Sequence, residues 1–173
     1  MTEVKTKFFS IKMPKMLKTA APDFLSMVLW GVICFGASKA FVFGRIAPFG
    51  VAAAASSKRN CALPAALGAI LGYIFSDKPE NTLRYIAAVL MVFGAKLVFE
   101  RFAEGDAVPV LISAAATAFA SFGYAAMTVI SGYGSLMALA ETVLCAGAAY
   151  FFKRTEEAFE HGKNLSLLSS GDR

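Results

Sequence analysis

The segment Val108–Ile130 reads VPVLISAAATAFASFGYAAMTVI and contains no charged residue in 23 consecutive positions. As an α-helix it would be about 34 Å long, slightly more than the roughly 30 Å of the hydrocarbon core of a bilayer. This segment therefore predicts a helix that spans a membrane.

Five further apolar segments surround this one and are separated from each other by polar or charged turns. Three have the length of candidate spans, and two are shorter: Phe24–Phe43, Leu83–Phe99 and Leu136–Phe152, then Val51–Ser57 and Ala62–Phe75. The composition agrees, because 57% of the residues are hydrophobic and 17% are charged, against about 45–50% and about 25% in soluble domains. We predict an all-α fold, a polytopic transmembrane bundle of about six helices, one or two of them short.

The shortest apolar segment follows Pro48, Phe49 and Gly50, which we expect to start a short helix. Proline is well tolerated in the first helical turn, where its missing N–H costs nothing. About ten residues are too few for an upright crossing of a bilayer. The segment is predicted either to be re-entrant or to pack among neighbouring helices where the bilayer is locally thin.

Positive charge divides the chain into three regions: a basic cytoplasmic arm (1–22), a helical bundle (23–153) and a cytoplasmic tail or linker to further helices (154–173). With the arm inside the cell, most Lys and Arg residues near the spans fall on the cytoplasmic side, as multi-pass proteins prefer. Both termini are then cytoplasmic. This asymmetry requires that the short segment Pro48–Ser57 crosses. Because the arm is tethered beside a span, we expect it to bind the anionic lipid surface and not nucleic acid.

Residues that could carry catalysis are scattered. The four Asp residues are far apart in sequence, and Cys34, Cys61 and Cys145 share no spacing typical of metal ligands. The single histidine, His161, lies in a polar stretch without a second ligand nearby. We predict no catalytic, cofactor-binding or metal-binding residues and no cofactor in this chain.

Small residues recur at helical spacing, most clearly at Gly68 and Gly72. In lipid, such residues let helix backbones approach closely. The favoured interpretation is packing within the chain, and the alternative is a face for self-association. Lys96, near the end of its helix, is expected to extend its ammonium toward the membrane surface and receives no role.

Two charges, Lys39 and Glu141, are expected at similar depths near the outer ends of the first and last spans. A charge inside a bilayer is costly, so opposite charges at matched depth tend to face the bundle and pair. We predict an intramembrane ion pair between them. The alternative is that each side chain reaches the outer interface separately.

One region is similar to a known family. Ser38-Lys39-Ala40-Phe41, leading through Arg45 to Ala47-Pro48-Phe49-Gly50, resembles the region after the first membrane helix of the stage II sporulation protein E family. Ala140-Glu141 and the basic exit Lys153–Glu157 resemble the middle of that family's membrane region. Two positions depart from the pattern: Lys39 stands where Arg is expected, and Ser38 where Gly is common.

The resemblance implies the first half of a membrane domain of about ten helices. In that family the membrane domain anchors, localises and regulates a manganese-dependent serine/threonine phosphatase. That phosphatase acts on a phosphorylated anti-anti-sigma factor in sporulating Firmicutes. The expected location is the cell membrane at the polar septum, with septal division proteins as partners and the lipid bilayer around the helices. Manganese is expected only in the phosphatase domain, which lies outside this chain, so the chain itself is not expected to be an enzyme.

An alternative of a different class is the substrate-capture subunit of a transporter for a vitamin or other small solute, because such subunits are also compact bundles of about six helices. A solute site at membrane depth needs several inward polar groups. The candidates are few: Lys39, Ser113, Thr117, Ser121 and Glu141. A third interpretation is a purely structural membrane scaffold.

Overall fold

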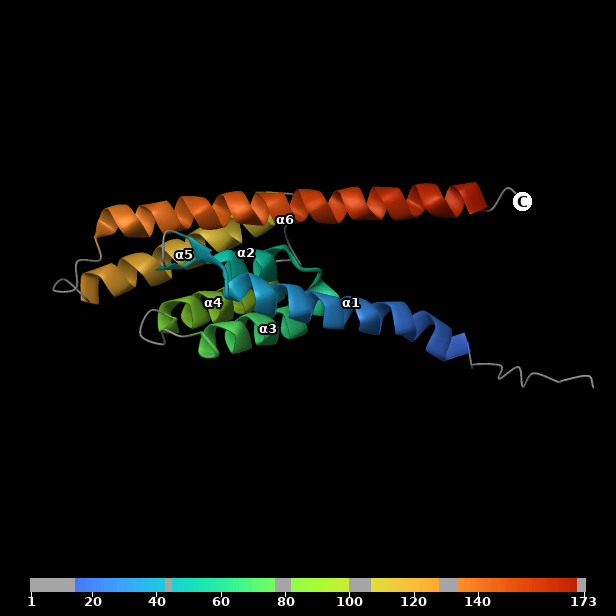
Figure 1. Ribbon diagram of the computed structural model, residues 1–173, viewed down its shortest axis with the longest axis horizontal. Helices are drawn as coiled ribbons and strands as arrows, with labels where there is room; N and C mark the ends of the chain where they lie inside the picture. Colours follow the sequence, from blue (N-terminus) through green and yellow to red (C-terminus); the bar gives the residue numbers. More distant parts are fainter. Residues whose placement is uncertain (1–14, 43–44, 77–81, 100–106, 128–133, 171–173) are drawn as a thin grey trace, which may run out of the picture.

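The computed structural model describes residues 15–42, 45–76, 82–99, 107–127 and 134–170, with side chains between positions 24 and 158. The described residues form six α-helices, two very short strands and one 3₁₀ turn (Figure 1). Their bounds are α1 Lys15–Ser38, β1 Phe41–Val42, β2 Arg45–Ile46, α2 Phe49–Ser56, η1 Arg59–Cys61, α3 Ala62–Ile74, α4 Leu83–Phe99, α5 Ala107–Met127 and α6 Ser135–Ser170. The predicted helical fold is confirmed, and α4 has the predicted bounds.

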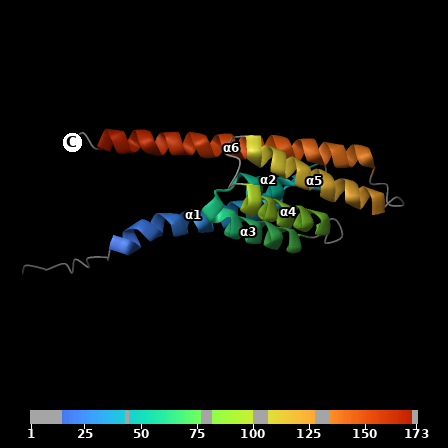
Figure 2. The ribbon, with the colours of Figure 1, turned by 180° about the vertical axis from the view of Figure 1, so that it is seen from behind.

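The helices run roughly along one common direction, with α2 at the centre (Figures 1 and 2). α2 contacts each of the other five α-helices. In both views the start of α1 and the end of α6 project beyond the bundle on the same side.

The chain between α1 and α2 differs from the prediction of a span that continues to Phe43. α1 begins earlier, at Lys15, and ends at Ser38. The two strands then pair antiparallel, with Phe41 opposite Ile46. The helix ends here because the backbone N–H groups of Lys39 and Ala40 turn back to Gly36 and Ala37, which closes the last helical turn tightly.

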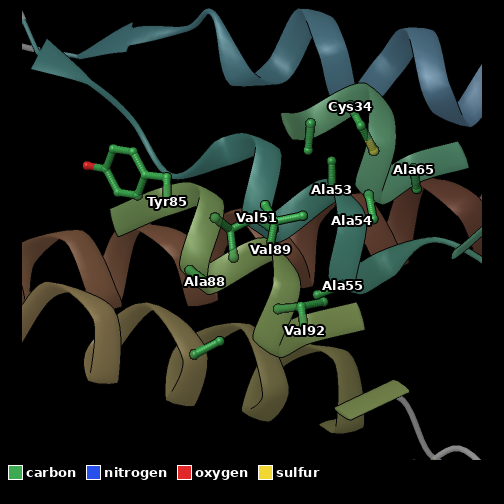
Figure 3. Packing of buried hydrophobic residues seen from close by; sticks show 14 of the residues in the cluster. Cys34, Val51, Ala53, Ala54, Ala55, Ala65, Tyr85, Ala88, Val89 and Val92 are labelled. Carbon is green, nitrogen blue, oxygen red and sulfur yellow. The ribbon is translucent and has the colours of Figure 1, made fainter. Parts of the chain in front are cut away.

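α2 is the core of the bundle. It begins at Phe49 with Pro48 as its N-cap residue, and its residues from Gly50 to Ser56 are all buried. Its side chains are mostly alanine methyl groups, so five helices can approach it closely. Figure 3 shows Val51 and Ala55 of α2 in the same buried cluster as Val89 and Val92 of α4. The predicted helix start at Pro48, Phe49 and Gly50 is confirmed.

Glycines permit close contact between α1 and α3. A Cβ atom added at Gly68 would lie 2.1 Å from the carbonyl oxygen of Gly31, and one added at Gly72 would lie 2.6 Å from that of Phe35. Both positions are too close for any side chain. Gly68 and Gly72 therefore serve helix packing within the chain, as the favoured interpretation predicted.

Two of the described helical segments are long and apolar enough to cross a membrane: Ala107–Met127 and Ser135–Ala158. Phe24–Ser38 is apolar but shorter. α6 does not stop at Phe152, where the last apolar segment ends in the sequence, but continues as one helix to Ser170. The expected boundary between bundle and tail therefore lies inside a continuous helix.

Candidate functional site

Tyrosines of α3 and α4 hold the entry to α2. The hydroxyl of Tyr85 donates to the carbonyl of Ile46 at 3.1 Å, and that of Tyr73 donates to the carbonyl of Ala47 at 3.3 Å. The two rings stack with centroids 5.3 Å apart, and both side chains are fully buried. These carbonyls precede the first helical turn, so the tyrosines satisfy backbone groups that the helix itself cannot.

A buried charge network lies beside Tyr85. The guanidinium of Arg84, on α4, pairs with Glu141 of α6 at 2.8 Å. The hydroxyl of Ser121, on α5, donates to the other oxygen of Glu141 at 2.9 Å. Residues Arg84 and Glu141 are only 6% and 8% exposed, so this network joins three helices in a region of low dielectric.

Aromatic rings complete the surroundings of Arg84. Its guanidinium carbon lies 4.7 Å from the ring centroid of Tyr85 and 5.0 Å from that of Tyr124. It also donates a hydrogen bond to the hydroxyl of Tyr85 at 3.1 Å. Cation–π contacts with desolvated rings add to the ion pair, so the guanidinium is stabilised by both a carboxylate and two rings.

Lys96, also on α4, holds the other end of α2. Its ammonium donates to the carbonyl of Ala54 at 3.3 Å, to the hydroxyl of Ser57 at 3.2 Å and to the carbonyl of Ser57. The last carbonyls of a helix have no partners within it and carry partial negative charge. A cation at this position therefore caps α2. The expectation that Lys96 reaches the membrane surface is wrong, because the residue is 2% exposed.

α4 thus holds α2 at both ends. Tyr85 and Lys96 are 11 residues apart, and their partners Ile46 and Ser57 are also 11 residues apart. The start of α4 thus contacts the entry to α2 and its last turn contacts the end of α2, so the two helices run side by side in the same direction.

α6 contacts α2 through smaller polar groups. The hydroxyl of Ser56, in the last turn of α2, donates to the carbonyls of Ala52 and, across the interface, Ala149 of α6 at 3.0 Å. The thiol of Cys145 lies 3.6 Å from the carbonyl of Pro48 and accepts a hydrogen bond from Thr117 at 3.1 Å. α6 is therefore tied to both ends of α2.

Glu141 has a different basic partner from the one predicted. Lys39 is exposed, and its ammonium lies 4.7 Å from the ring centroid of Phe35, while Glu141 pairs with Arg84. The predicted Lys39–Glu141 pair is corrected to Arg84–Glu141. Lys39 follows the end of α1, where the chain turns away, and so does not face the bundle.

Sequence reasoning missed Arg84 and Lys96. Arg84, in the first turn of α4, received no role although the predicted span contains it. Lys96 carried a usable signal: it follows Tyr85, Val89 and Val92 at intervals of 4, 3 and 4 residues, which places all four on one helix face. That face is buried against α2.

No group of three or more His, Cys, Asp or Glu side chains that could hold a metal occurs among the described residues. Cys34 and Cys145 are fully buried in apolar helices. The side chain of His161 lies outside the described residues. Arg84, Glu141, Ser121 and Tyr85 form one network near the start of α2, and Lys96 lies at its other end; all five position helices.

Comparisons with known proteins add no relatives to this description. No family model matches the chain, and no curated protein or solved structure shows significant similarity to it.

Proposed function

We propose that this chain is a multi-pass membrane protein whose bundle anchors and regulates a partner domain outside the chain. The observation that carries the proposal is the distribution of polarity. Arg84, Lys96 and Glu141 are buried, whereas large apolar side chains cover the exterior, including Leu111, Phe119, Leu136, Val143 and Phe151 at 64–82% exposure. Water would strongly disfavour such an exterior, and lipid favours it.

The two long apolar helices support the same conclusion. In the most apolar 18-residue stretch of each helix, only 22% of α5 and 17% of α6 is buried inside the protein. The core helix of a soluble protein would be mostly buried. The apolar surface of α5 and α6 is best matched by acyl chains.

The first and last helices lie as expected if both termini are cytoplasmic. α1 begins and α6 ends on the same side of the bundle (Figure 1). Lys58 and Arg59 are exposed between α2 and α3, as expected of a cytoplasmic turn.

The more specific proposal is the membrane-anchoring, localising and regulatory domain of a sporulation serine/threonine phosphatase of the stage II sporulation protein E type. Three features of the fold support it beside the sequence resemblance. Residues Ala47 to Gly50, which carry that resemblance, form the entry to the buried helix α2, and Glu141 lies at the centre of the charge network. The continuous helix α6 offers a rigid connection from the bundle to the further membrane helices that the resemblance implies.

Solute capture is less well supported. The polar side chains that could line a solute site bind other parts of the protein: Ser121 binds Glu141, Thr117 binds Cys145, and Ser113 binds the carbonyl of Val110. Lys39 lies on the exterior. These groups stabilise the packing of helices.

Cysteine labelling tests the topology. With the three native cysteines replaced, single cysteines at the exposed Asn60, between α2 and α3, and at Asn81, which lies outside the described residues, are expected to react with impermeant reagents from the cytoplasm and from outside, respectively. Labelling of both positions from one side of intact membranes would contradict the proposed crossing by α3.

The phosphatase assignment has a separate test. The reading frame that contains this chain should continue into a phosphatase domain, and the whole protein should dephosphorylate a phosphoserine anti-anti-sigma factor with manganese. Residues 1–173 alone should give no turnover under the same conditions. A reading frame without that domain, or turnover by residues 1–173, would contradict the assignment.

A further inference from the structure

The last turn of α2 contacts two different helices through adjacent residues. Ser57 receives the ammonium of Lys96 from α4, and Ser56 donates to the carbonyl of Ala149 in α6. Both serines are buried, at 3% and 4% exposure. One turn of helix therefore connects α4 and α6 by hydrogen bonds.

The strengths of the two connections differ. The hydrogen bonds from Lys96 are charge-assisted and reach carbonyls at the negative end of the helix dipole, so they dominate the position of this turn. The hydrogen bond from Ser56 joins neutral groups, and its single proton is shared with the carbonyl of Ala52. The weaker contact with α6 therefore depends on where Lys96 holds the turn.

We propose that the last turn of α2 is a joint that couples α4 to α6, with Lys96 as its positioning residue. When the ammonium leaves the carbonyls of Ala54 and Ser57, the turn loosens and Ser56 releases Ala149. The change then reaches the part of α6 that extends beyond the bundle to Ser170. Its regulatory meaning rests on the proposed function, in which α6 connects this bundle to the rest of the membrane domain.

Hydrogen–deuterium exchange of the protein in lipid nanodiscs tests the joint. Lys96→Met removes the charge and keeps most of the side-chain length. Amides 52–57 are expected to exchange about tenfold faster or more, because charged hydrogen bonds are lost. Amides 145–153 of α6 should exchange about threefold faster, the effect of losing a neutral hydrogen bond. Lys39→Met, the same substitution at an exposed lysine, should change neither segment.

Two serine variants complete the test. In a protein that already carries Ser56→Ala, Lys96→Met should still speed exchange in α2. Exchange in α6 should stay at the rate seen with Ser56→Ala alone. Ser57→Ala removes one oxygen partner of Lys96 and should give the same pattern at smaller size, so the test does not depend on the folding of Lys96→Met.

If amides 52–57 exchange faster and amides 145–153 of α6 do not, the proposed coupling is wrong. An equal response of α6 with Ser and with Ala at position 56 would also overturn it. Either result concerns coupling inside this chain alone. The membrane topology is tested separately by cysteine labelling, and the phosphatase assignment by the reading frame.

Discussion

α2 and α6 are both rich in apolar residues, yet they occupy opposite environments. α2 reads FGVAAAAS and is buried from Gly50 to Ser56. In the most apolar 18-residue stretch of α6 only 17% is buried, and Leu136, Val143 and Phe151 are exposed. The comparison teaches that between these two apolar helices side-chain size, more than polarity, separates the interior from the exterior.

The physical reason is the proposed lipid environment. Acyl chains are as apolar as leucine, so burying a large apolar side chain gains little there. Close packing and internal hydrogen bonds stabilise the bundle instead. Small residues and paired polar groups gather inside, as in α2 and around Arg84, and large apolar residues remain outside.

The largest expected effect concerns the charge network. Glu141→Gln keeps the shape of the side chain but leaves Arg84 without its carboxylate, and should lower the free energy of unfolding by about 3–5 kcal/mol. Denaturant titration in detergent measures it. Glu157→Gln is the matched control, because the Arg154–Glu157 pair is much more exposed, at 68% and 31% for the two side chains. There the loss should be about 0–1 kcal/mol.

The double variant Arg84→Met/Glu141→Leu sharpens this result. Because both charges are removed together, it should be more stable than Glu141→Gln. If the loss of stability in the double variant equals the sum of the losses in Arg84→Met and Glu141→Leu, the two side chains do not depend on each other.

A smaller loss is expected where backbones meet. Gly68→Ala would place a methyl group against the carbonyl oxygen of Gly31, which cannot rotate away, and should cost about 1–3 kcal/mol. At Gly94 of α4 a Cβ atom meets nothing within 4 Å, so Gly94→Ala should leave the free energy of unfolding unchanged or raise it slightly. Equal losses at the two glycines would contradict the assigned packing of α1 on α3.

Valine truncation addresses the comparison of α2 with α6 directly. Val51→Ala, at a fully buried position, should cost about 1–2 kcal/mol because it leaves a cavity in the core. Val143 is 64% exposed, and Val143→Ala should change the free energy of unfolding by less than about 0.5 kcal/mol. If the order were reversed, the assignment of interior and exterior would be wrong.

The smallest effect is expected at Lys39. Lys39→Met removes an exposed charge whose contact is the ring of Phe35. Thermal unfolding should shift by an amount equivalent to about 0.5–1 kcal/mol or less. A loss as large as that of Glu141→Gln would revive an essential role for Lys39 inside the bundle.

Much of the helical layout could be predicted from the sequence. Apolar segments bounded by charged turns gave α4 with its observed bounds and the start of α2 at Pro48. Gly68 and Gly72 were also predictable as packing positions, because small residues four apart lie on one face of a helix. These features depend on residues close together in the sequence, so the sequence alone is enough to predict them.

The partners across the bundle depended on the tertiary structure. The sequence predicted Lys39 as the partner of Glu141, but the fold brings Arg84 of α4 to it instead. The capping of α2 by Lys96 likewise follows from a contact between distant segments. Sequence by itself determined which segments are apolar helices. Which faces meet depends on how six helices pack, because pairing between charges requires a distance of a few ångströms that residue order alone does not set.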